Sequence, residues 1–329
     1  LALFKLRTRY LMLGALVLIF SPGLIQFAHF GTTESLLMLL FTWLLYLCLR
    51  VLEAHPNASL NRIYVYIGTA AGLAVATKVS SLLFMLMPVY VLTVRHLKSH
   101  EGDKTSGYDR FWEWFNEIVF LVFVAGSVAI IASPHNVISW KEFISSMYYE
   151  SSVAIGSAQV FYTRTFAGAV PILFQLKNIF PYSLGWPVFA GFLIAFLLLP
   201  YTKKYNFLRL AFLTFFIPWA FTYTKWTRFM APIMPLMIIF ATLFLAAFYE
   251  KLKFKIQNSK TQTKVQKFLV HTCNFAFCLL TFAFLYPGIR FLTVYLQPDV
   301  RVQASEWMIK HIPPRSLMLQ ETANVVDLP

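Results

Sequence analysis

Long runs of apolar residues are the feature that most constrains how this 329-residue chain can fold. An α-helix needs about 20 apolar residues to cross a hydrocarbon core about 30 Å thick. Nine runs near that length occur, at residues 10–27, 34–51, 63–77, 79–95, 117–133, 184–200, 206–223, 229–249 and 268–287. The sequence therefore predicts an all-α polytopic membrane protein with about nine transmembrane helices.

The composition agrees with a membrane protein. Hydrophobic residues make up 58% of the chain and charged residues 13%, about half the charged share of a soluble domain. This balance excludes a water-soluble globule, a disordered chain and a coiled coil. The three cysteines, Cys48, Cys273 and Cys278, lie inside apolar runs without metal-ligand spacing, so we expect them to be small buried hydrophobic residues.

The net charge of +14 indicates how the helices are oriented rather than a nucleic-acid partner. If the N-terminus is cytoplasmic, 18 of the 28 Lys and Arg residues fall in cytoplasmic segments and 10 in external ones. Cytoplasmic loops of membrane proteins carry the excess of Lys and Arg. The sequence thus predicts a multi-pass plasma (inner) membrane protein with its N-terminus in the cytoplasm and its C-terminus outside.

Two predicted external segments are longer than a connection requires. Residues 134–183 mix aromatic and polar residues, which is typical of amphipathic helices at the membrane interface, and we expect them to cover a lipid-facing site. Residues 288–329 predict the start of an extracytoplasmic C-terminal domain, after a transmembrane module over residues 1–287. The chain begins with Leu, stops abruptly at Pro329 and shows no signal-peptide pattern, so we interpret it as a fragment.

No GxGxxG, Walker, HExxH or CxxC motif is present, so the candidate functional residues are charged groups at the external boundary. Glu34 opens an apolar run after Thr32 and Thr33, where it either complements a capped helix N-terminus or belongs to a site. His29 either orients a carboxylate, contacts phosphate, ligates a metal or has no role.

Four cations are also candidate site residues, and each has two interpretations. Lys78, Lys225, Arg228 and Arg164 fall at predicted external boundaries, where each either contacts lipid head groups separately or joins the others around a lipid-linked phosphate. Glu142 and Glu150 lie eight residues apart on the segment 134–183, so they share one face if it is helical.

Several motifs, in order along the chain, resemble those of the GT-C superfamily of glycosyltransferases that use polyprenyl-phosphate sugars, such as the protein O-mannosyltransferases and the lipid A aminoarabinose transferase. They are Ser21-Pro22, His29-Phe30-Gly31-Thr32-Thr33-Glu34, Gly72-Leu73-Ala74 with Thr77-Lys78, Ser133-Pro134, Leu184-Gly185-Trp186-Pro187, Arg228-Phe229 with Pro232 and Pro235, and Asp299, Arg301, Ala304, Trp307 and Ile312-Pro313.

The resemblance implies transfer of a sugar from a polyprenyl-phosphate donor to a lipid, glycan or protein acceptor outside the membrane. It assigns the general base to an acidic residue of a first external loop, which would precede residue 1, so that we expect the fragment not to transfer sugar. Glu34 would position the acceptor or a metal, and Lys78 and Arg228 would bind the lipid phosphate. We therefore predict Glu34 and His29 as catalytic residues and Lys78, Arg228, Lys225 and Arg164 as residues that bind the lipid phosphate.

The resemblance leaves a divalent metal open as a cofactor, with Glu150 and His135 as possible acceptor or metal residues. Some relatives carry Glu-His where this chain has Glu150-Ser151. Two other classes remain. Secondary transporters usually show internal repeats and paired broken helices near the membrane midplane, whereas here the charges gather at the predicted outer boundary and the outer loops are long. A scaffold for other membrane proteins is the other alternative.

Overall fold

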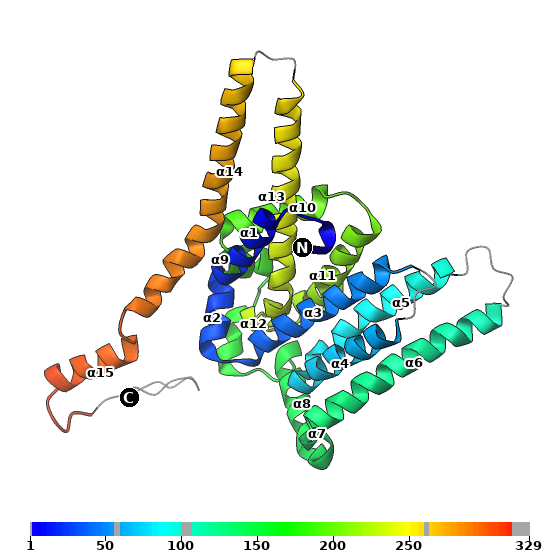
Figure 1. Ribbon diagram of the computed structural model, residues 1–329. Coiled ribbons are helices and arrows are strands. Elements are labelled where there is room, and N and C mark those ends of the chain that lie inside the picture. Colours follow the sequence, from blue (N-terminus) through cyan, green and yellow to red (C-terminus); the bar gives the residue numbers. More distant parts are fainter. Residues whose placement is uncertain (1, 56–59, 100–106, 260–262, 318–329) are drawn as a thin grey trace.

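The computed structural model describes residues 2–55, 60–99, 107–259 and 263–317. Within these ranges the chain forms helices and no strand, as predicted (Figure 1). The first half contains α1 (Thr8–Ile19), α2 (Pro22–Phe30), α3 (Thr33–Glu53), α4 (Asn61–Thr77), the 3-10 helix η2 (Val79–Met85), α5 (Leu86–Ser99) and α6 (Gly107–Ala132). The second half contains α7 (His135–Ile138), α8 (Trp140–Ile155), η3 (Phe161–Phe166), the π-helix η4 (Gln175–Ile179), α9 (Phe180–Leu184), α10 (Trp186–Leu198), α11 (Lys203–Phe221), α12 (Thr227–Met230), η5 (Ala231–Ile233), α13 (Met234–Gln257), α14 (Thr263–Leu292), η6 (Thr293–Leu296) and α15 (Val300–His311).

The predicted polytopic architecture is confirmed, but the count of nine membrane spans is not. In the described part of the chain, five helices are long and apolar enough to cross a membrane, or up to seven if each of two bent pairs counts as one span. The bent pairs are α1 with α2, at 56°, and the η4–α9 segment with α10, at 119°. Pro22 begins α2, and Gly185, at φ +85°, separates α9 from α10. Both bends therefore occur at residues that interrupt a helix.

Two long helices connect opposite ends of the bundle. Helix α3 has 21 residues and α13 has 24, so each is at least about 30 Å long. At one end, Glu250 of α13 contacts Arg9 of α1 at 2.6 Å, and Glu53 of α3 forms an ion pair with Lys204 of α11. We call this the basic end, because the Lys and Arg residues of the predicted cytoplasmic segments gather there.

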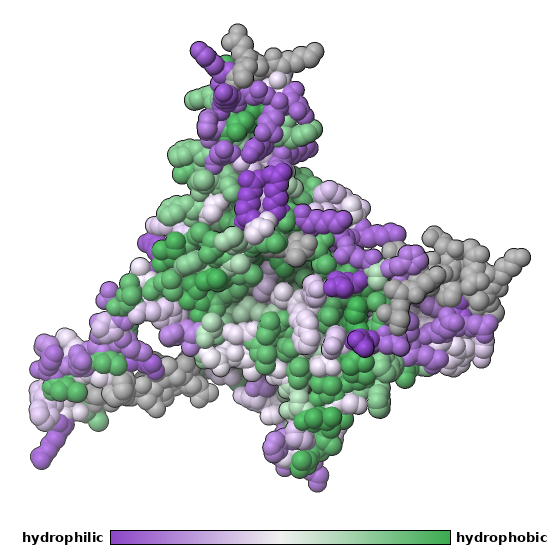
Figure 2. All heavy atoms as spheres, viewed as in Figure 1, coloured by the Kyte–Doolittle hydropathy of each residue, from purple (hydrophilic) through white to green (hydrophobic). Residues whose placement is uncertain are grey.

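The surface has the distribution expected of a membrane protein. Figure 2 shows apolar side chains over the middle of the molecule and hydrophilic ones at the tip of the α13–α14 hairpin. Only 11% of the most apolar stretch of α14 is buried, so this helix exposes apolar side chains along most of its length. Cys48 and Cys273 are buried as predicted, but the prediction for Cys278 is wrong, because it lies on the exposed face of α14.

Close helix contacts hold α4 against α6. A Cβ atom on Gly72 would lie 2.4 Å from the carbonyl oxygen of Ala125, and one on Gly68 would lie 2.7 Å from Val124. Glycines four residues apart let two membrane helices approach closely. This contact fixes the C-terminal end of α4, where Lys78 follows.

The structure describes the first of the two predicted external segments fully and the second only in part. Residues 134–183 do form short helices, α7, α8, η3, η4 and α9. Helix α14 continues to Leu292, past the predicted domain boundary at residue 287, and α15 has no buried residue. Residues 318–329 of the predicted C-terminal domain lie outside the described residues, so that domain stays a prediction.

Candidate functional site

A cavity of about 700 Å³ opens at the end of the bundle opposite the basic end. We call it the acid–cation cavity. Its lining comes from the start of α3, the junction of α4 with η2, the middle of α8, the end of α11 and α12. The lining residues are Gly31, Thr32, Thr33, Glu34, Lys78, Val79, Ser80, Met147, Glu150, Ser151, Ala154, Trp219, Arg228 and Phe229. Glu34, Lys78, Arg228 and Glu150, which were singled out from the sequence, therefore line one cavity.

Glu34 and Lys78 form an ion pair at this cavity. Glu34 is the second residue of α3, and its side chain is 5% exposed. The ammonium Nζ of Lys78 donates a hydrogen bond to Glu34 Oε1 at 3.1 Å. Thr32 occupies the N-cap position of α3, but its side chain makes no capping hydrogen bond. Glu34 is thus more than a complement to the helix dipole, because a specific cation satisfies it.

The fold positions Lys78 by ending α4 directly before it. The amide of Lys78 donates to the carbonyl of Ala74, and its own carbonyl accepts from the amide and the hydroxyl of Ser81. Its backbone at φ −159° and ψ 122° is extended, so the side chain leaves the helix axis toward α3. The side chain is 29% exposed, so the ammonium reaches both Glu34 and the cavity.

Aromatic residues form the wall between the two cations. Lys78 Nζ lies 5.7 Å from the ring centre of Phe229, and Arg228 Cζ lies 5.9 Å from the same ring. Trp219 packs against Phe229 with ring centres 4.8 Å apart. The indole Nε1 of Trp219 is buried and has no hydrogen-bond partner within the described residues.

Helix α8 is anchored to the segment that precedes Arg228. The amide and the hydroxyl of Thr224 donate to the carbonyl of Ala154, at 3.1 and 3.4 Å. Gly156 ends α8 at φ +84°, and a Cβ atom there would lie 2.6 Å from the ring of Tyr223. Only glycine fits this close approach at a positive φ. These contacts fix Glu150 and Arg228 on neighbouring walls.

A second cavity, of about 460 Å³, adjoins the first. Both are lined by Lys78, Val79 and Met147. The lining of the second cavity is completed by Ala76, Thr77, His135, Asn136, Ser139, Glu142, Phe143 and Ser146. Glu142 and Glu150 therefore share one face of α8, as the sequence predicted, but they face adjoining cavities.

The structure places three of the sequence candidates elsewhere. His29 is exposed on α2, and its ring packs against Tyr295 at 4.1 Å between centres. Arg164 is exposed in η3 and lines neither cavity.

Lys225 is 4% exposed and donates to the carbonyls of Thr222 and Ala220, at 2.7 and 3.2 Å. Burial lowers the pKa of this ammonium. It satisfies carbonyls at the end of α11 rather than facing either cavity.

The described residues do not assemble an obvious metal centre. No three His, Cys, Asp or Glu side chains in this part of the chain lie close enough to share an ion. Glu34 is paired with Lys78, and the position after Glu150 is Ser151. The described residues of the two cavities therefore form no cluster of three metal ligands.

Trp219 and Met147 are site residues that reasoning from the sequence missed. Trp219 stands near the end of an apolar run, where tryptophan is common simply because it favours the membrane interface. The position of Trp219 therefore did not show whether its ring lines a cavity or lies at the membrane interface.

Comparison with protein families matches residues 1–137 to the dolichyl-phosphate-mannose-protein mannosyltransferase family. Searches of curated proteins and of solved structures gave no match. The matched region includes Glu34, Lys78 and His135, whereas Glu142, Glu150, Trp219 and Arg228 lie beyond it. Residues 1–137 are thus similar to the dolichyl-phosphate-mannose-protein mannosyltransferases, which agrees with the resemblance to GT-C glycosyltransferases seen in the sequence motifs.

Proposed function

We propose that this protein transfers a sugar, mannose in the first instance, from a polyprenyl-phosphate donor to an acceptor hydroxyl at the external face of the membrane. The family of residues 1–137 supports the reaction class and the donor. The observation that carries the assignment to particular residues is the acid–cation cavity, where Lys78 and Arg228 flank one aromatic wall. The donor phosphate would lie between these two cations.

The two cations suit the chemistry of the leaving group. When the acceptor oxygen attacks the anomeric carbon, the bond from that carbon to the phosphate oxygen breaks, and the phosphate leaves with the bonding electrons. Cations placed where negative charge grows lower the barrier. Arg228 offers a planar donor fork for phosphate oxygens, and Lys78 offers a compact charge.

Glu34 would act mainly by holding Lys78. Its carboxylate accepts a hydrogen bond from the ammonium, which therefore keeps two further protons for the phosphate. The acceptor hydroxyl must also lose a proton to a general base, and the family resemblance gives that role to an acidic residue of an external loop. Glu150 is the second carboxylate of the cavity, and no cation of the described residues forms an ion pair with it.

The acceptor would approach through the second cavity. Its lining is polar, with the hydroxyls of Ser139 and Ser146, the amide of Asn136 and the carboxylate of Glu142. Because Lys78 and Met147 line both cavities, a hydroxyl there lies next to a sugar held in the acid–cation cavity. This arrangement fits a hydroxyl-bearing peptide or glycan acceptor.

The test is donor binding and single-turnover transfer by the full-length protein in liposomes. We expect Lys78→Gln and Arg228→Gln each to weaken binding of polyprenyl-phosphate mannose by about 10-fold or more, the cost of one charge-assisted hydrogen bond. Arg164→Gln is the matched control, since it removes an exposed cation that lines neither cavity, and it should bind the donor like the wild type. Equal weakening by all three variants would refute the assignment and indicate general attraction to the membrane surface.

A further inference from the structure

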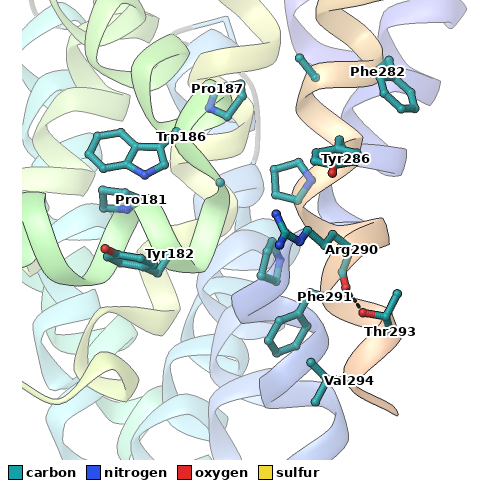
Figure 3. Close-up of a pocket in the computed structure, with 14 residues that line it drawn as sticks. Pro181, Tyr182, Trp186, Pro187, Phe282, Tyr286, Arg290, Phe291, Thr293 and Val294 are labelled. Carbon is teal, nitrogen blue, oxygen red and sulfur yellow. Dashed lines mark hydrogen bonds between the residues drawn. The ribbon is translucent and has the colours of Figure 1, made fainter. Parts of the chain in front are cut away.

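A third cavity, of about 720 Å³, lies between α2, the α9–α10 corner and α14 (Figure 3). We call it the α14 cavity. Its lining residues are Pro22, Pro181, Tyr182, Gly185, Trp186, Pro187, Phe282, Ala283, Tyr286, Pro287, Arg290, Phe291, Thr293 and Val294. It shares no lining residue with the two cavities described above. The proposed transfer reaction therefore makes no use of it.

Close backbone contacts build this cavity. A Cβ atom on Gly288 would lie 1.7 Å from the carbonyl oxygen of Phe20, and one on Gly185 would lie 2.5 Å from the ring of Pro287. Helix α14 thus touches both the α1–α2 bend and the α9–α10 corner near its Pro287. Because the three elements meet closely there, the cavity walls are fixed relative to one another.

The lining separates charge from apolar surface along α14. Arg290 and Phe282 are eight residues apart, about 12 Å along a helix. Phe282 and Ala283 form the part of the lining nearer the basic end, Arg290 follows, and Phe291, Thr293 and Val294 line the cavity beyond it. Figure 3 shows the guanidinium of Arg290 pointing from α14 toward the α9–α10 corner. Among the lining residues Arg290 alone is charged, and an apolar stretch extends from it toward Phe282.

Arg290 has no acidic partner among the described residues. No Asp or Glu lines the cavity, and Arg290 forms no ion pair within the described ranges. Tyr182 and Trp186 are exposed beside it, as rings at the level of lipid head groups are. A cation without an acid beside it is complementary to phosphate. The ammonium of a zwitterionic head group would find no carboxylate there.

We propose that the α14 cavity binds one anionic phospholipid of the external leaflet, with its phosphate at Arg290 and an acyl chain along Phe282 and Tyr286. With the predicted topology, Arg290 lies nearer the external boundary than Phe282 does, as the phosphate of such a lipid lies outside its acyl chains. The site is separate from the donor site, so it would stabilise the contact of α14 with the bundle rather than take part in sugar transfer.

Native mass spectrometry of the purified full-length protein with added phosphatidylglycerol or phosphatidylcholine tests this site. The wild type should retain one phosphatidylglycerol and prefer it about 10-fold over phosphatidylcholine, because both lipids offer a phosphate to Arg290 but the choline cation finds no carboxylate beside it. Arg290→Gln should abolish the preference, whereas Lys310→Gln, which removes a cation from α15, should leave it unchanged. Ala283→Phe should prevent binding by filling the apolar end while Arg290 stays in place.

Two results would overturn the proposal. Equal retention of both phospholipids by the wild type, or retention of phosphatidylglycerol by Arg290→Gln at the wild-type level, would show that Arg290 does not select the lipid. Displacement of the bound lipid by an equimolar amount of polyprenyl phosphate would instead make the α14 cavity a second site for the donor. If one of the variants Arg290→Gln and Ala283→Phe fails to fold, the other alone still tests lipid binding in the α14 cavity.

Discussion

Lys78 Nζ lies 3.1 Å from Glu34 Oε1, although 44 residues of sequence separate the two side chains. Removal of one partner from a buried pair leaves a charge without compensation. Because Lys78 is partly exposed, we expect Lys78→Met to lower the free energy of unfolding by about 1–3 kcal/mol. Adding Glu34→Gln should recover at least half of that loss.

Thermal unfolding in detergent, arranged as a double-mutant cycle, measures this coupling. Lys141→Met, an exposed lysine of α8, is the control and should change the free energy of unfolding by less than about 0.5 kcal/mol. Strict additivity of the Lys78 and Glu34 effects would mean that the pair does not form in the folded protein.

Gly72 should tolerate no larger side chain. Gly72→Leu forces a side chain into the carbonyl of Ala125, so α4 must move away from α6 and carry Lys78 with it. We expect a lower melting temperature and weaker donor binding. Gly126→Leu on α6 is the matched control, because nothing lies within 4 Å of a Cβ atom at Gly126. Similar melting temperatures for the two variants would contradict the close α4–α6 contact.

Glu34→Gln should affect turnover more than donor binding. The amide keeps the size of the side chain but holds the Lys78 ammonium less firmly, so phosphate still binds while its geometry at the reacting bond is poorer. We expect single-turnover transfer to fall by about 100-fold and the donor Kd to change by less than about 3-fold. Glu306→Gln, on the exposed face of α15, serves as the control. Unchanged transfer by Glu34→Gln would reduce Glu34 to a structural residue of α3.

The charge distribution predicts that residue 259 faces the cytoplasm and residue 305 the outside. Cysteines placed at Ser259 and Ser305 would be labelled on intact cells with a maleimide that does not cross membranes. The background needs Cys278→Ser, because Cys278 is exposed whereas Cys48 and Cys273 are buried. Position 305 should react and position 259 should not. Reaction at position 259 would reverse the topology and move the acid–cation cavity to the cytoplasmic face.

The apolar runs predicted the helical membrane fold because run length and bilayer thickness are directly related. They did not predict the breaks. Pro22 and Gly185 lie inside or beside apolar runs, and hydropathy alone does not tell a bend from a straight span. Likewise, the sequence singled out Glu34 and Lys78 from their positions at run boundaries. Their approach depends on how tightly α4 packs on α6, which a linear pattern does not encode.

The sequence also could not show that Lys225 and Arg228 occupy different surroundings. They are three residues apart and look equivalent in the sequence, yet Lys225 turns back to the carbonyls of α11 and Arg228 lines the cavity. The end of α11 leaves carbonyls without helical partners, and the nearest ammonium satisfies them. Such local competition for a cation appears only in three dimensions.

Photo-crosslinking of the donor shows whether it binds in the acid–cation cavity. A polyprenyl-phosphate mannose with a diazirine on the first isoprene unit would be irradiated with the full-length protein, and the labelled peptides would be mapped by mass spectrometry. We predict labels on the wall of the acid–cation cavity, at Met147, Trp219 or Phe229, which disappear with excess unlabelled donor and are weakened by Arg228→Gln but not by Arg164→Gln. Labels confined to α14, or labels at Met147, Trp219 and Phe229 that excess donor does not remove, would contradict the account.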